Sequence, residues 1–173
     1  MIKKGIFVLM LTVFAISCSK DDAVPHNPTL TIQVDGQNKG MFNLSQLKAN
    51  LTAQSISIFD PVHGKQKNYR AFPLADALFY LFETNFLPTN GTVQFSALDG
   101  FMASASVNRA TEVGGFLAFE DLDVAGEANW EGVAPENNND PAPFYIVWSG
   151  QNQNPTTDGY PWPYQLETIN LVN

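Results

Sequence analysis

The fold is decided by the stretch Pro73-Leu74-Ala75-Asp76-Ala77-Leu78-Phe79-Tyr80-Leu81-Phe82. The apolar residues that recur in it at helical spacing are Leu74, Ala77, Leu78, Leu81 and Phe82. This spacing predicts an amphipathic helix that buries one face. Pro73 suits the first position of a helix, where an N–H would have no partner within the helix. The helix is expected to end at Asn85 or Pro88.

Shorter strand-like stretches surround this helix. Leu30, Ile32 and Val34 alternate with polar residues, as in a half-buried strand that begins near Thr29. Asn43, with Gln46 three residues later, predicts the capped start of a short helix. The other predicted strands are 56–58, 67–71, 92–97, 101–107, 116–119, 144–148 and 166–172. The sequence therefore predicts one α+β domain over residues 29–173, strand-rich and built on a mixed sheet.

The charge of the chain limits its partners. The 173 residues carry a formal net charge of −8, and basic residues are not clustered. An acidic surface repels nucleic acid and anionic lipid, so we expect no nucleic-acid partner. The simplest reason for the charge is solubility.

Residues 1–17 have the three parts of an export signal. Lys3 and Lys4 give a positive start, residues 6–14 form a short apolar run, and Ala15-Ile16-Ser17 places small residues before Cys18. This pattern resembles a bacterial lipobox, which implies that Cys18 receives a lipid. The alternative is an ordinary signal peptide with an incidental cysteine. Cys18 is the only cysteine in the sequence, so the chain can form no internal disulfide.

Residues 18–28 predict a lipidated tether ahead of the domain. Ser19-Lys20-Asp21-Asp22 resembles the export tag of surface lipoproteins in the Bacteroidetes, and the alternative is a solvated acidic linker. The expected location is the cell envelope, as an outer-membrane lipoprotein held by its N-terminal lipid and able to face outward.

Five short motifs follow one another along the domain. They are Phe42-Asn43-Leu44-Ser45-Gln46-Leu47, Ala71-Phe72-Pro73-Leu74-Ala75-Asp76-Ala77-Leu78, Ala97-Leu98-Asp99-Gly100-Phe101, Leu117-Ala118-Phe119-Glu120 and Tyr160-Pro161-Trp162-Pro163-Tyr164-Gln165-Leu166. In this order they resemble the sulfite-oxidase-type molybdopterin-binding domain. The resemblance spans most of residues 42–172. It implies that fold and an association with an envelope redox system or redox partner.

The resemblance also implies a molybdopterin cofactor whose molybdenum is ligated by a cysteine before the Pro73 helix. The corresponding stretch, Ile56 to Arg70, contains no cysteine, and no residue in it replaces a thiolate chemically. Basic residues able to hold a pterin phosphate are few, with Arg70 and Arg109 as weak candidates. The chain looks closer to cofactor-less relatives, so no cofactor is expected.

Other metal or catalytic sites find little support. His26 and His63 lack the spacing of a zinc site. The acidic stretch with Glu120, Asp121, Asp123, Glu127 and Glu131 could hold calcium, but it lacks EF-hand spacing and is more typical of a solvated loop. Trp148-Ser149-Gly150 is not a nucleophile elbow, and we assign no catalytic residue.

Tyr160, Trp162 and Tyr164 alternate with prolines close to the last strand. Proline lowers the entropy cost of presenting a ring, so these three are candidates for a ligand or partner surface. The alternative is that the rings pack the end of the core, which we favour for Trp148.

Three hypotheses remain. The first is a non-catalytic, lipid-anchored binding module that assists an envelope redox system. The second is a molybdopterin-dependent oxidoreductase without the cysteine ligand, which needs a deep pocket lined by Arg70 or Arg109. The third is a surface module for glycan or protein that uses Tyr160, Trp162 and the acidic loop. The absent thiolate weighs against an enzyme.

Overall fold

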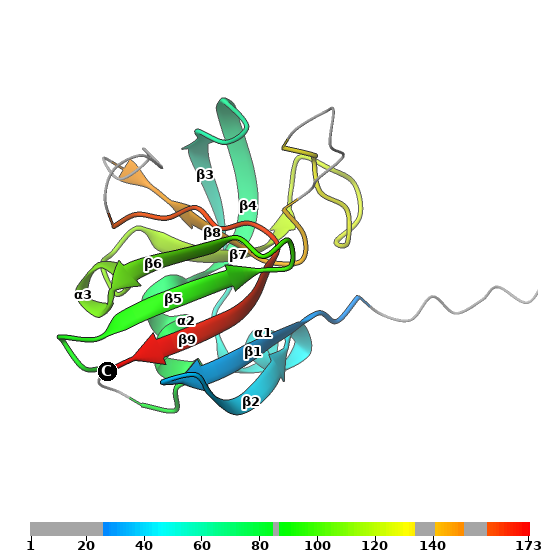
Figure 1. Ribbon diagram of the computed structural model, residues 1–173. Coiled ribbons are helices and arrows are strands. Elements are labelled where there is room, and N and C mark those ends of the chain that lie inside the picture. Colours follow the sequence, from blue (N-terminus) through cyan, green and yellow to red (C-terminus); the bar gives the residue numbers. More distant parts are fainter. Residues whose placement is uncertain (1–25, 85–86, 134–140, 151–158) are drawn as a thin grey trace, which may run out of the picture.

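The computed structural model describes residues 26–84, 87–133, 141–150 and 159–173. Its elements are β1 (Thr29–Val34), β2 (Gln37–Asn43), α1 (Leu44–Asn50), β3 (Gln54–Asp60), β4 (Lys65–Pro73), α2 (Leu74–Leu81), β5 (Thr92–Ala97), β6 (Met102–Ser106), α3 (Val107–Ala110), β7 (Gly115–Asp121), β8 (Tyr145–Trp148) and β9 (Leu166–Val172). Strands outnumber short helices, so the predicted strand-rich α+β class is confirmed (Figure 1).

The strands form two sheets. The five-stranded sheet has the order β2-β1-β9-β5-β6, and the four-stranded sheet has the order β3-β4-β7-β8. β1 and β9 pair in parallel while the other pairs are antiparallel, so the larger sheet is mixed, as predicted. The first and last strands of the predicted domain therefore lie side by side.

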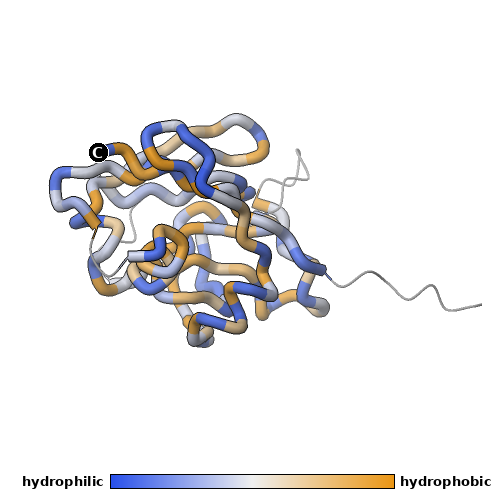
Figure 2. The backbone as a smooth tube through the Cα atoms, turned by 90° about the horizontal axis from the view of Figure 1, so that it is seen from below, coloured by the Kyte–Doolittle hydropathy of each residue, from blue (hydrophilic) through white to orange (hydrophobic). Residues whose placement is uncertain are grey.

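α2 supplies one wall of the core. Its buried residues, Leu74, Ala77, Leu78 and Leu81, are four of the five that the helical spacing identified. The helix contacts β4 and β7. Figure 2 shows hydrophobic segments gathered in the middle of the body and hydrophilic segments at its outer turns.

Both predicted helix termini of α2 differ from the structure. Pro73 is the last residue of β4 and caps the helix, which begins at Leu74. The helix ends at Leu81, earlier than Asn85 or Pro88, because Glu83 takes a left-handed φ of 51°. The N–H of Thr84 then donates to the carbonyl of Phe79 at 3.0 Å, which closes the helix end.

The start of α1 confirms the predicted capping box. The Asn43 side chain accepts from the N–H of Gln46 at 2.9 Å, and the Gln46 side chain accepts from the N–H of Asn43 at 2.9 Å. Both exchanges satisfy N–H groups that a helix start leaves unpaired.

The predicted lipidation residue Cys18 and the export tag at 19–22 lie outside the described residues. Within the described ranges, none of the helices has the length and apolar character needed to cross a membrane.

Candidate functional site

A buried ammonium lies at the centre of the most polar part of the four-stranded sheet. The Lys67 side chain on β4 is fully buried, and its Nζ donates to Asp121 Oδ2 at 2.7 Å and Oδ1 at 2.9 Å. It also donates to Glu131 Oε2 at 3.0 Å and lies 3.4 Å from Asp123 Oδ2. The register explains the first contact, because the neighbouring Tyr69 pairs directly with Asp121 on β7.

A further buried charge, Asp60, lies at the end of β3. Its carboxylate accepts from the hydroxyls of Tyr69 at 2.7 Å and Tyr145 at 3.3 Å, and from the N–H groups of Val62 at 2.8 Å and His63 at 3.1 Å. Nδ1 of His63 lies 3.1 Å from Asp60 Oδ2. These contacts fix the turn between β3 and β4.

Glu131 links the two clusters. His63 Nε2 lies 3.2 Å from the Glu131 carbonyl oxygen, and the Glu131 N–H donates to Asp121 Oδ2 at 3.1 Å. Trp130 covers this point and packs on the Tyr69 ring, with 5.9 Å between centroids. We call Asp60, His63, Lys67, Tyr69, Asp121 and Glu131 the polar network.

Proton affinities follow from these contacts. Burial alone lowers the pKa of Lys67, but the Asp121 and Glu131 carboxylates raise it above its ordinary value. Burial raises the pKa of Asp60, yet its bonds from His63 and Tyr69 hold it below the ordinary range. Burial opposes protonation of His63 as well, but Asp60 raises the pKa of the imidazole overall. These contacts therefore favour the charged forms of Asp60, His63 and Lys67.

The acidic loop does not surround a vacant cation site. The carboxylates of Asp121, Asp123 and Glu131 lie close together, as a calcium site would require, but they surround the Lys67 ammonium. Among the residues that the structure describes, no group of three His, Cys, Asp or Glu side chains could hold a metal ion.

Both arginines proposed for a pterin phosphate are paired with carboxylates. Arg70 Nε donates to Glu120 Oε2 at 3.0 Å on the surface of β4 and β7. Arg109 on α3 donates to Glu112 at 3.1 Å and lies over the Tyr160 ring at 4.1 Å. The stretch Ile56 to Arg70 lies in β3, β4 and their turn and offers no thiol. This donor set does not fit molybdopterin.

The C-terminal aromatic rings pack mainly into the core. Tyr160 is 6% exposed, Trp162 is 5% exposed and Trp148 is fully buried. The Tyr160 hydroxyl donates to Glu112 Oε2 at 2.7 Å, and Trp148 Nε1 donates to the Pro161 carbonyl at 2.7 Å. Tyr164 is half-buried against Tyr145. The structure thus favours core packing over a stacking surface for Tyr160 and Trp162.

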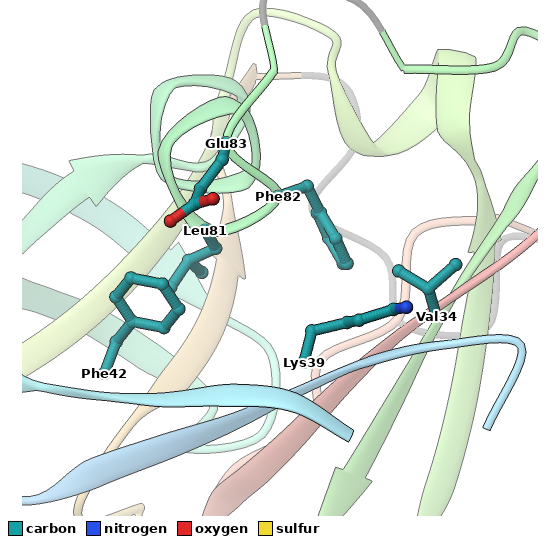
Figure 3. Close-up of a pocket in the computed structure, with 6 residues that line it drawn as sticks. All are labelled: Val34, Lys39, Phe42, Leu81, Phe82 and Glu83. Atoms are coloured by element: carbon teal, nitrogen blue, oxygen red, sulfur yellow. The ribbon is translucent and has the colours of Figure 1, made fainter. Parts of the chain in front are cut away.

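The pocket in Figure 3 lies elsewhere, between β1, β2 and the end of α2. It has a volume of about 260 Å³ and is lined by Val34, Lys39, Phe42, Leu81, Phe82 and Glu83. Neither Arg70 nor Arg109 lines it. Its single lysine and single glutamate give it no net charge.

The β5–β6 hairpin forms one edge of the larger sheet. Ala97 N–H donates to Phe101 O at one end and Val107 N–H donates to Gly91 O at the other, both at 2.9 Å. Hydrogen-bonded pairs alternate along an antiparallel ladder. The N–H groups of Met102, Ser104 and Ser106 and the C=O groups of Met102 and Ser104 therefore point away from β5, to an edge that no described strand covers.

The sequence analysis did not identify the buried Lys67 or the exposed apolar residues around the β5–β6 turn, although the sequence contains a signal for each. Lys67 is separated from Tyr69 and Ala71 by even numbers of residues, so in a strand all three side chains lie on the same, inward face. Leu98, Phe101 and Met102 put large apolar residues around the Asp99-Gly100 turn, where polar residues are usual. The Asp99 carboxylate accepts from Phe101 N–H at 2.9 Å and so helps to form this turn. Comparisons with protein-family models and with curated proteins found no match for this chain.

Proposed function

We propose that this protein is a lipid-anchored, non-catalytic binding module of the bacterial envelope, which holds an extended segment of a partner protein along β6. One observation carries the proposal: β6 is an edge strand that contains no charged residue and no proline, with three outward N–H groups. A protein edge of this kind accepts an added strand through main-chain hydrogen bonds.

Two of the other edges are protected, and β3, like β6, has no charge or proline before its buried final residue Asp60. β2 carries the exposed Lys39. β8 is covered by its own chain, because Ile146 N–H donates to Pro163 O and Leu166 N–H donates to Phe144 O. Natural sheets commonly block their edges by such means, and β6 is the edge of the larger sheet that lacks them.

The envelope location rests on the lipobox-like residues before Cys18, and the accessory role beside a redox system rests on the resemblance to the sulfite-oxidase-type domain. The proposed fold family draws support from where its motifs fall. Pro73-Leu74 opens α2, Ala97 to Phe101 forms the β5–β6 turn, and Leu117 to Glu120 lies in β7. We propose that no pterin is bound, since Arg70 and Arg109 are neutralised by glutamates.

Site-specific photo-crosslinking tests the strand addition. A photoreactive residue at Ser106, in the full-length protein expressed in its native envelope, should give one discrete adduct. Ser104→Pro removes an outward N–H without breaking a bond to β5, so it should abolish that adduct. The matched control carries the photoreactive residue at the exposed Ser57 on β3. An adduct that survives Ser104→Pro, or that also forms from Ser57, would exclude binding along β6.

Elemental analysis separates this function from the oxidoreductase. Protein purified from a host that makes the cofactor should contain neither molybdenum nor pterin fluorescence. Either signal near one per chain would overturn the non-catalytic assignment.

A further inference from the structure

The turn between β5 and β6 presents three large apolar side chains to solvent. Leu98 is 58% exposed, Phe101 is 53% exposed and Met102 is 65% exposed. We call these three residues the apolar tip. Scattered exposed apolar residues are ordinary on protein surfaces, but three of them within five positions form a patch.

The backbone holds this tip in place. Leu98 N–H donates to Gln165 O at 2.9 Å and Gly100 N–H donates to Ala97 O at 3.0 Å. The carboxylate of Asp99, the charged residue of the turn, accepts from Phe101 N–H. The apolar side chains are therefore presented by a hydrogen-bonded turn, which reduces the entropy lost when they contact another surface.

The strand register places the tip at the end of the sheet where the chain enters from its N-terminal segment. One row across the sheet joins Met102, Ser96, Thr168, Thr31 and Met41. Thr31 is the third residue of β1, and Met41 is itself 58% exposed. Three strand spacings separate Thr31 from Met102, which corresponds to about 14 Å. Figure 1 shows the start of β1 and the β5–β6 turn at the same end of the sheet.

Chain length limits how far this end can lie from the predicted lipid. Eight residue steps separate Cys18 from His26, the first described residue. A fully extended chain covers at most about 3.6 Å per residue, so His26 lies within about 29 Å of a lipid-bearing Cys18. The membrane surface would then lie close to the end that carries the apolar tip.

We propose that Leu98, Phe101 and Met102 dock on the bilayer that holds the Cys18 lipid, as a second and apolar membrane contact. This inference rests on the lipid anchor of the proposed function. The contact is apolar, because residues 98–102 contain no lysine or arginine and the chain has a net charge of −8. It therefore fits a zwitterionic lipid surface, where no electrostatic repulsion opposes the tip.

The proposal is tested with the full-length lipidated protein in phosphatidylcholine vesicles. Phe101→Trp places an indole reporter on the tip, and brominated acyl chains quench indole fluorescence only at short range. After subtraction of the wild-type signal, the emission of this tip indole should fall about twofold, as for a ring buried in the headgroup and acyl boundary. The matched control is Phe59→Trp, on the β3–β4 hairpin and 45% exposed, whose emission should not change. Adding Leu98→Ser and Met102→Ser to Phe101→Trp should remove the quenching.

Vesicle flotation distinguishes a failure of the lipid anchor from a failure of the apolar tip to dock. If the protein floats and the tip indole is not quenched, docking is wrong while the lipid anchor stands. A blue-shifted emission of the tip indole without quenching would mean that protein covers the tip, which also overturns docking on lipid. If the protein does not float, the anchor fails and this inference fails with it.

Discussion

The two hairpins β3–β4 and β5–β6 differ in how strongly side-chain contacts fix them to the rest of the protein. The polar network holds the β3–β4 hairpin in place. Asp60 fixes its turn through the N–H of His63, and Lys67 bonds to Asp121 at the end of β7 and to Glu131 in the following loop. The β5–β6 hairpin has no charged residue on β6 and leaves one edge and its apolar tip open. Buried charges fix a hairpin to its neighbours, but the groups that form these bonds are then not accessible to a partner. A hairpin whose strands carry no charge leaves outer backbone groups and the side chains of its turn available for contact.

Among variants that test this difference between the hairpins, Lys67→Met is expected to cause the largest loss of stability. Removing the ammonium leaves the buried Asp121 carboxylate without a cationic partner, which should destabilise the protein by about 3–5 kcal/mol. The measurement is the free energy of unfolding in urea. The double variant Lys67→Met with Asp121→Leu removes both charges and should recover part of the loss. A loss below about 1 kcal/mol for the single variant would mean that the pair does not secure the hairpin.

A smaller loss is expected from Tyr69→Phe. The Tyr69 hydroxyl donates to the buried Asp60 carboxylate, and a hydrogen bond to a charged acceptor contributes about 1.5–3 kcal/mol. The same urea titration measures the change. Tyr80→Phe, on a half-buried tyrosine of α2, is the matched control and should have little effect. Equal losses in the two variants would contradict a special role for the Asp60 contact.

The third effect is a pH dependence of the free energy of unfolding that arises from His63 in the β3–β4 turn. The pKa of His63 is raised above 6.5 in the folded state, so the protonated imidazole stabilises the fold. This stabilisation is complete below the unfolded pKa and is lost as the pH rises through the folded pKa. The stability of the wild type relative to His63→Gln should therefore be greater at about pH 5 than at about pH 8. A constant difference across this range would contradict the assigned Asp60–His63 contact.

The smallest effect is expected in the β5–β6 hairpin. Phe101→Ser changes an exposed ring and should alter the free energy of unfolding by no more than about 0.5 kcal/mol. Phe95→Ala, on a fully buried ring of the same hairpin, should destabilise by about 3–5 kcal/mol and calibrates the comparison. A large loss from Phe101→Ser would show that the tip serves stability and not contact.

The sequence predicts those parts of the fold whose signals are local. Thr92–Ala97 and Leu166–Val172 are found at the expected residues, because their alternating or continuous apolar residues follow strand periodicity. β2 was missed, since Gln37–Asn43 has little alternation and becomes a strand by pairing with β1. α3 is a single turn of four residues, too short to show helical periodicity.

The candidate sites were less predictable because they depend on contacts distant in sequence. Lys67 and Asp121 are 54 residues apart, and β4 must pair with β7 before either charge has a partner. Tyr160 and Trp162 looked accessible in a turn-rich segment, yet Trp148 and Tyr145 lie beside them and enclose both rings. The open edge of β6 could be recognised only once the strand order was known.

The position of β9 sets the order in which this protein can acquire its structure. β9 lies between β1 and β5, so the two parts of the larger sheet have no shared neighbour until residues 166–172 are available. A chain delivered from its N-terminus presents β1 to β8 before the central strand of the larger sheet arrives. The β1–β2 pair and the β5–β6 pair therefore remain separate units until β9 has emerged, so the larger sheet closes late.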